Sequence, residues 1–163
     1  MKKILIALAL FSSLSVSANQ DAEVLGVAFG STCEETVQKL NKDYGTPESQ
    51  SADKLVYLNE MFEGFKADRV ELGFQDLQGT TKLNQARFYF VCPNKAAAIA
   101  RMKSLVKKME TRYSVSYDEE DGGTAFYKGG NSPLGIGCLF TIFVSPYQGK
   151  WTCQLRYGKF QFK

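Results

Sequence analysis

The sequence predicts an α+β fold in which two helices pack on one antiparallel sheet, in the order β-α-βββ-α-ββββ. Two observations carry this prediction. Two segments have apolar residues at helical spacing, and a series of short strand-like segments with turn signals follows each of them. The order divides the chain into two segments of one helix and its meander, 24–92 and 93–163. No residue-level repeat accompanies this division, so duplication is one interpretation of the order.

The first helix is predicted from its boundary signals. A short apolar strand at 24–29 precedes it and ends at Gly30. The Ser-Thr-Cys-Glu motif at 31–34 fits a capping box, in which Ser31 and Glu34 satisfy free N–H groups of the first turn. One apolar face follows, made of Cys33, Val37, Leu40 and Tyr44. Gly45 then suits a helix end, before a polar loop at 46–53.

Three strand-like segments follow at 54–58, 69–77 and 86–92. The middle one alternates apolar and polar residues, as a half-buried strand does. The last one is apolar on both faces, so we expect it to lie in the centre of the sheet. Gly79 marks the turn between these two strands.

The second helix is the most strongly patterned element. Pro93 or Asn94 begins it, and three consecutive alanines favour it. Its predicted buried stripe comprises Ile99, Met102, Val106, Met109 and Tyr113. The opposite side is basic, with Arg101, Lys103, Lys107 and Lys108, and we interpret it as a solvated face. A weak hairpin at 114–127, a glycine-rich loop at 129–137 and a strong hairpin at 139–162 complete the chain.

Residues 1–18 have the composition of a secretory signal peptide. Lys2 and Lys3 precede an unbroken apolar run at 4–11, and Val16-Ser17-Ala18 is a small-residue cleavage site. The apolar run is too short to span a bilayer, which needs about 20 residues. We therefore expect residues 19–163 to be the mature protein, a single domain without stable membrane insertion, exported to a bacterial periplasm or secreted. A lipid anchor is not expected, because no cysteine lies near the cleavage site.

The cysteines are interpreted through that compartment. An exported protein with an even number of cysteines typically holds them as disulfides, so Cys33, Cys92, Cys138 and Cys153 are predicted to form two. Topology favours a Cys33–Cys92 bond, which leaves Cys138–Cys153. The second pairing is left open, because a hairpin turn at 146–149 separates those two cysteines.

Composition excludes several kinds of chemistry. The chain has no histidine, so it has no Ser-His or Cys-His machinery and no His-ligated metal site, and we expect no metal or cofactor. The formal charge of +3 includes Lys2 and Lys3, which leaves the mature part near neutral and argues against nucleic acid as a partner. An acidic run at 118–121 before two glycines departs from the EF-hand spacing, so we interpret it as a solvated hairpin tip.

Catalysis by carboxylates alone is the remaining enzymatic hypothesis. The candidate carboxylates are Glu71 with Asp76, Glu60 with Glu63, and the cluster at 118–121. Each also has a plain structural interpretation on the polar face of a strand or at a turn. We therefore expect a protein without enzymatic activity.

Aromatic residues concentrate in the last third of the chain, and most of them belong to the core of a two-layer fold. Tyr147 lies in a predicted turn and Trp151 directly after it. Exposed Tyr and Trp side chains on a rigid hairpin are typical anchors for protein recognition. These two residues are therefore the predicted binding site.

The segment from Gly26 to Val37, with Tyr44-Gly45-Thr46-Pro47 after it, resembles the opening of many small exported bacterial proteins. In those proteins a strand ending in Phe/Leu-Gly-x-Ser leads into a capped helix, then into Gly-x-Pro. The outer-membrane assembly lipoproteins and the beta-lactamase-inhibitor-like fold share this plan of a helix followed by a meander. The resemblance implies a binding or envelope-associated module, and it transfers no functional residue.

We therefore expect an exported, non-catalytic protein that binds another protein of the cell envelope, as an inhibitor or as an immunity-type partner. An accessory protein of envelope assembly or maintenance is the alternative. A carboxylate-dependent hydrolase is a further one.

Overall fold

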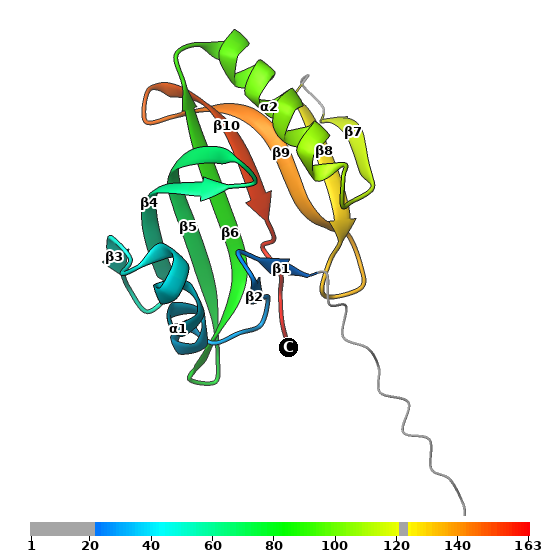
Figure 1. Cartoon of the computed structure of the whole chain (residues 1–163). Coiled ribbons are helices and arrows are strands. Elements are labelled where there is room, and N and C mark those ends of the chain that lie inside the picture. Colours follow the sequence, from blue (N-terminus) through cyan, green and yellow to red (C-terminus); the bar gives the residue numbers. More distant parts are fainter. Residues whose placement is uncertain (1–21, 121–123) are drawn as a thin grey trace, which may run out of the picture.

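The computed structural model describes residues 22–120 and 124–163, so the predicted signal peptide lies outside the described residues. It contains an eight-stranded antiparallel sheet, a two-stranded hairpin and two helices (Figure 1). The predicted α+β class with two helices is confirmed, but the sheet is larger than a pair of small meanders. The helices are α1 (Cys33–Tyr44) and α2 (Lys95–Met109).

The eight strands follow the order β3-β4-β5-β6-β10-β9-β8-β7, and every neighbouring pair is antiparallel. Their bounds are β3 Ser49–Gln50, β4 Lys54–Phe62, β5 Phe65–Leu77, β6 Thr80–Cys92, β7 Val115–Glu120, β8 Thr124–Asn131, β9 Cys138–Tyr147 and β10 Lys150–Tyr157. Strand β6 pairs with both β5 and β10, so its predicted central position is confirmed.

The start of the domain differs from the prediction. Instead of one strand at 24–29, β1 (Glu23–Val24) and β2 (Val27–Ala28) form a tight hairpin. Leu25 and Gly26 both have positive φ at its turn.

Helix α1 is capped by Thr32. The Thr32 hydroxyl accepts from the Glu35 N–H at 3.2 Å, and the Glu35 carboxylate accepts from the Thr32 N–H at 2.8 Å. The predicted Ser31–Glu34 capping box is therefore wrong by one residue.

Strands β4, β5 and β6 are longer than their apolar runs indicated. Two tight turns join them, at Glu63-Gly64 and Gln78-Gly79, and all four residues have positive φ. Because such turns match the twist of the strands, pairing continues to the tip of each hairpin. The meander thus forms a long ladder from Lys54 to Cys92.

Helix α2 begins as predicted. The Asn94 side chain accepts from the Ala97 N–H at 2.8 Å. Most of the predicted stripe is buried, with Ile99 and Tyr113 partly buried against the same core. Lys103, Lys107 and Lys108 are exposed, as expected of a solvated face. Within the described part of the chain, no helix is long and apolar enough to cross a membrane.

The chain ends in a tail, residues 158–163, that continues beyond β10 alongside the start of β6 (Figure 1). Asn84, which is 1 % exposed, holds it with two hydrogen bonds: its Nδ2 donates to the Phe160 carbonyl and its own carbonyl accepts from the Phe160 N–H, both at 2.9 Å. Gln75 holds Phe162 through its side-chain amide alone: Nε2 donates to the Phe162 carbonyl at 3.1 Å, and Oε1 accepts from the Phe162 N–H at 3.0 Å. These bonds bring the buried Phe160 ring against Phe29.

Replacing Asn84 by alanine should weaken this attachment. The substitution removes the donor to Phe160 and leaves a buried carbonyl without a partner, so we expect a loss of about 1–3 kcal/mol in the free energy of unfolding. Urea unfolding followed by tryptophan fluorescence measures it. Asn131→Ala is the control, because Asn131 is exposed. Equal losses in the two variants would contradict a holding role for Asn84.

Candidate functional site

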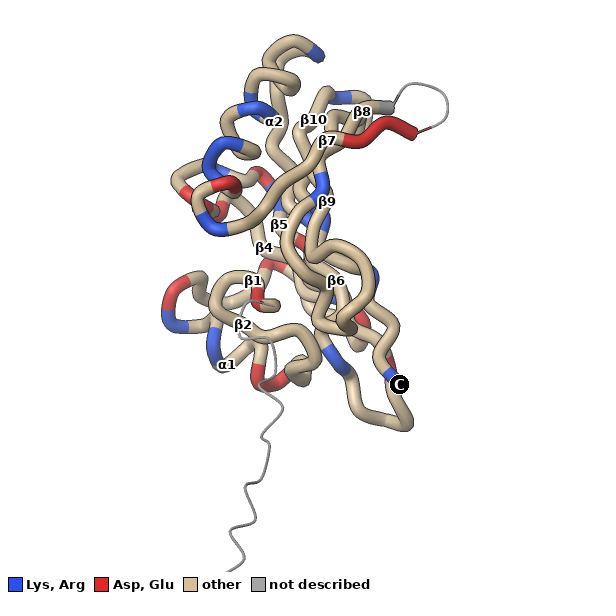
Figure 2. Tube along the Cα trace, turned by 90° about the vertical axis from the view of Figure 1, so that its right-hand side faces the viewer, with Lys and Arg blue, Asp and Glu red and all other residues tan. Residues whose placement is uncertain are grey.

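Both helices cover the same face of the sheet. Leu40 of α1 and Leu105 of α2 belong to one core cluster with Phe88 of β6, and Figure 2 shows the two helices on one side of the strands. No helix or strand within residues 22–120 and 124–163 covers the other face, which we call the open face. Register and alternation assign to its centre Arg69, Glu71, Arg87, Tyr89, Val91, Phe126, Lys128, Thr141, Phe143, Ser145, Tyr147, Thr152, Gln154 and Arg156.

Aromatic rings lie along the middle of the open face. The Tyr147 ring turns back from the end of β9 onto Tyr89 of β6, with ring centroids 4.3 Å apart. Phe143 lies directly opposite Phe126 in the β8–β9 pair. The guanidinium carbon of Arg156 lies 5.1 Å from the Phe143 ring centroid. Tyrosine, phenylalanine and arginine side by side are the composition that protein interfaces favour.

The two predicted binding residues do not share a surface. Trp151 lies opposite Pro146 and Tyr147 opposite Lys150, so the two aromatic side chains point to opposite faces of the sheet. Trp151 is half-buried on the helix side, where the Lys95 ammonium lies 5.4 Å from its ring centroid. The structure therefore places Tyr147 on the open face and separates Trp151 from it.

Part of the open face is internally neutralised. The Glu71 carboxylate accepts from Arg69 Nε at 2.8 Å and from the Tyr89 hydroxyl at 3.4 Å. Burial opposes a charge on Arg69, but the hydrogen bond to Glu71, the charge of Glu71 and two nearby tyrosines together outweigh burial and raise the pKa of this guanidinium. Lys128 and Asp118 form a second ion pair. The bond to Lys128 lowers the pKa of the Asp118 carboxyl.

Two arginines in the centre of the face have no such partner. Arg87 of β6 and Arg156 of β10 lie directly opposite each other in the sheet. In the described part of the chain, neither has a carboxylate oxygen within 4.0 Å. When the Gln85 amide oxygen faces Arg87, it accepts from Nε at 2.6 Å and Nη2 at 2.9 Å, which adds no charge. Arg156 Nε is buried without a hydrogen-bond partner.

The pKa of the Arg156 guanidinium is lowered in this arrangement. Burial lowers it first, and the neighbouring Arg87 cation lowers it further. The charge of Glu120, at the end of β7, acts in the opposite direction without forming an ion pair. Among the described residues, the centre of the open face therefore carries two adjacent cations that form no ion pair.

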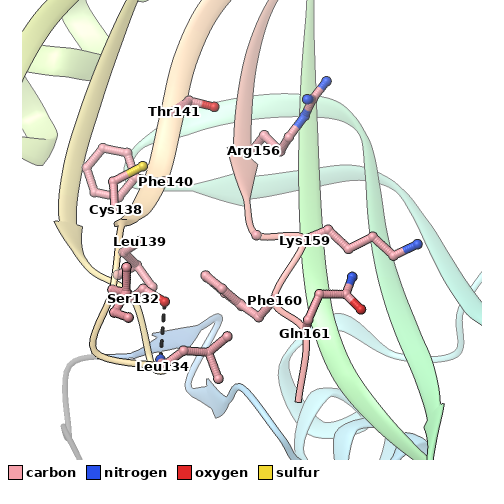
Figure 3. Close-up of a pocket in the computed structure, with 12 residues that line it drawn as sticks. Ser132, Leu134, Cys138, Leu139, Phe140, Thr141, Arg156, Lys159, Phe160 and Gln161 are labelled. Carbon is pink, nitrogen blue, oxygen red and sulfur yellow. Dashed lines mark hydrogen bonds between the residues drawn. The ribbon is translucent and has the colours of Figure 1, made fainter. Parts of the chain in front are cut away.

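A hollow of about 300 Å³ adjoins this centre and shares Arg156 with it. It lies between the loop after β8, the start of β9 and the C-terminal tail (Figure 3). Arg156 and Lys159 extend to the same side, away from Phe160 (Figure 3). The loop contributes an apolar rim, in which Leu134 is 43 % and Ile136 87 % exposed.

The predicted carboxylate pairs do not meet as acid and base. Glu71 and Asp76 lie five residues apart on one strand, about 16 Å, and Asp76 accepts from the Gly79 N–H in a turn. Glu63 forms an ion pair with Arg112 instead of facing Glu60. Burial raises the pKa of Glu60.

The acidic run is only partly described. Its first three acids belong to β7, and residues 121–123 lie outside the described residues. No group of three or more Asp, Glu, Cys or His side chains in the described residues has an arrangement that would hold a metal ion.

All four cysteines are free thiols in the structure, and the predicted Cys33–Cys92 bond is wrong for this topology. Leu83 exchanges backbone hydrogen bonds with Gly30 and Ser31, at 2.8 and 2.7 Å. The start of α1 therefore lies beside the start of β6, and Cys92 lies at the other end of that strand, about 30 Å away.

The Cys138–Cys153 pairing fails for a similar reason. The turn of the β9–β10 hairpin lies at Gln148-Gly149, and Cys153 faces Val144 across the ladder. Cys138 and Val144 are six residues apart on β9, about 20 Å.

The geometry indicates another pairing. Cys92 faces Trp151, and Cys153 faces Phe90, so the two cysteines are diagonal neighbours on one face of central strands. Diagonal Cα atoms lie about 7–8 Å apart, slightly beyond the roughly 6.8 Å that a disulfide spans, so a bond between them needs a small shift of the backbone.

We expect oxidation to make this shift and to link Cys92 to Cys153, which non-reducing peptide mapping would detect. Cys92→Ser should leave Cys153 alkylatable after unfolding; a Cys33–Cys153 peptide would contradict the prediction.

Sequence reasoning missed Arg87, Arg156 and Phe143. Alternation within the strands at 86–92 and 150–157 does separate their side chains from the core residues. The sequence does not indicate that β6 pairs with β10. This pairing brings together two arginines that are more than sixty residues apart in the chain.

Comparison with protein-family models, with curated proteins and with solved structures finds no match for this chain. The resemblance of residues 24–47 to exported helix-plus-meander proteins therefore stays an expectation.

Proposed function

We propose that this protein is an exported, non-catalytic binding protein whose open face docks another protein of the cell envelope, as an inhibitor or immunity-type partner. The supporting observation is the open face itself: one side of a large sheet that no described helix or strand covers, with Tyr89, Tyr147 and Phe143 beside Arg87 and Arg156. Rigid aromatic and arginine side chains on a sheet provide recognition at small conformational cost.

A non-catalytic role rests on the chemistry of the same face. Two of its carboxylates, Glu71 and Asp118, are each engaged by a cation. The chain has no histidine that would act as general base near neutral pH. The two helix-plus-meander segments, 24–92 and 93–163, contribute jointly to the face, so the proposal treats them as one binding unit.

Site-specific photo-crosslinking in producing cells tests this proposal. A benzophenone amino acid replaces Phe143 on the open face, or Lys103 on the exposed side of α2 as a matched control. We expect a discrete crosslinked protein from position 143 that position 103 does not give, and its loss when Tyr147 is also changed to alanine. Identical patterns from both positions, or none from position 143, would refute a docking role for the open face.

A further inference from the structure

The like-charged pair in the centre of the open face needs an explanation. Arg87 and Arg156 are directly opposite residues on two central strands. Like charges in this position repel each other and weaken the sheet. Nearby residues relieve the repulsion only in part: Glu71 lies opposite Arg87 on β5 but forms its ion pair with Arg69, and the Gln85 amide is neutral.

Two arginines side by side suit one carboxylate. A planar guanidinium binds a carboxylate through paired, charge-assisted hydrogen bonds. Arg156 Nε is buried and has no acceptor, so no hydrogen bond at that atom ties the guanidinium to the protein. Arg87 Nη1 takes no part in the Gln85 contact. A carboxylate between the two would accept from both and cancel their repulsion.

The surroundings favour a protein as the source of that carboxylate. Phe143 stacks against Arg156, and Leu134 and Ile136 form an exposed apolar rim at the adjoining hollow. Apolar contacts around a central charge are typical of protein interfaces. A polyanion fits less well, because Arg69 and Lys128 on the same face are already paired with Glu71 and Asp118 and are not available to its phosphates.

We infer that the partner protein places an acidic side chain between Arg87 and Arg156, an inference that rests on the proposed function. Apolar side chains of the partner then lie over Phe143 and Ile136. Lys159, whose side chain extends to the same side as that of Arg156, adds a third positive charge at the edge (Figure 3). The partner is therefore recognised by an exposed loop that combines Asp or Glu with apolar residues.

Selection of short cyclic peptides displayed on phage tests the inference while the partner itself is unidentified. The peptides are selected on the purified protein and then synthesised. We expect most peptides to contain an Asp or Glu. Replacing that residue by Asn or Gln should weaken binding about tenfold or more.

The double variant Arg87→Gln with Arg156→Gln should weaken binding of the original peptides by a similar factor. Combining the amide peptide with the double variant should weaken binding no further, because both changes remove the same contact. Lys107→Gln with Lys108→Gln removes the same charge from α2 and should leave binding unchanged.

A stability measurement shows that the loss is not caused by misfolding. Because one arginine of the pair then faces a neutral side chain, Arg156→Gln should leave the thermal midpoint unchanged or raise it by about 1–3 °C. A clear fall in the midpoint would contradict repulsion between the two arginines.

The outcomes separate this inference from the proposed function. Peptides that bind the double arginine variant normally but lose binding with Phe143→Ala would refute the acidic side chain and leave the open face as a docking surface. Peptides that are insensitive to both changes, or failure to select any, would refute both.

Discussion

Gly158→Ala should strongly destabilise the protein, by about 3–5 kcal/mol. Gly158 has φ +77°, a conformation that costs a residue with a side chain about 1–2 kcal/mol. A Cβ atom there would also lie well inside van der Waals contact with the Asn84 carbonyl oxygen, and 3.0 Å from the Phe160 nitrogen. Those two atoms form the hydrogen bond that attaches the C-terminal tail, so the methyl group would force the tail away from β6.

Gly135→Ala is a closely matched control. Gly135 also has φ +77°, but nothing lies within 4 Å of the position that a Cβ atom would take there. Only the conformational cost applies, and we expect a loss of about 1–2 kcal/mol. Urea unfolding of the two variants in parallel isolates the effect of the close approach. Similar losses would show that the tail yields without cost and that the Asn84–Phe160 bond contributes little.

The helix starts show where local signals suffice. The Asn94 cap of α2 is one of the two predicted starts, Pro93 and Asn94, because the residues that decide it are adjacent in sequence. At α1 both Ser31 and Thr32 are hydroxyl residues followed three positions later by an acid. The Ser31 carbonyl accepts from the Leu83 N–H and is therefore occupied outside the helix, whereas the Thr32 carbonyl accepts the first intrahelical bond from Thr36. A contact fifty residues away thus decides between two equal local signals.

The site was less predictable than the fold. Tyr147 and Trp151 are close in sequence, but the turn at Gln148-Gly149 fixes their register so that they point to opposite faces. A shift of one residue in a turn reverses the face of every side chain in the strand. The sequence specifies a turn within 146–149 without specifying this register.

The long-range pairing of β6 with β10 had the largest consequences. It creates the Arg87–Arg156 pair and the diagonal neighbours Cys92 and Cys153. Two-sided apolar character correctly predicts that β6 is central, but it does not name the strand that lies on the second side. Both the candidate site and the arrangement of the cysteines depend on which strand lies on that second side of β6.

The reduced protein should lose stability steeply in alkaline solution because of Cys153. This thiol is fully buried between central strands. Burial, and secondarily the neighbouring Cys92, raises its pKa from an ordinary value of 9.0 to about 12. Between these two values the unfolded chain has released the proton that the folded protein retains. The free energy of unfolding therefore falls as the pH rises, by up to about 1.4 kcal/mol per pH unit and about 4 kcal/mol in all.

Urea unfolding of the phosphine-reduced protein from pH 6 to pH 11 measures this loss. Cys153→Ala should be less stable than the parent protein at pH 7, because it leaves a small cavity. Its stability should then fall less steeply above pH 9, so that the difference between the two proteins narrows. Cys33→Ala is the matched control: the Cys33 thiol is only half-buried, burial raises its pKa less, and its removal should change the slope less. Parallel curves for the parent and Cys153→Ala across this range would mean that the thiol ionises without unfolding the protein.

Oxidation that links Cys92 to Cys153 removes the titrating proton, so it should abolish the difference in slope. The alkaline loss of stability is thereby connected to the cysteine pairing predicted from the strand register.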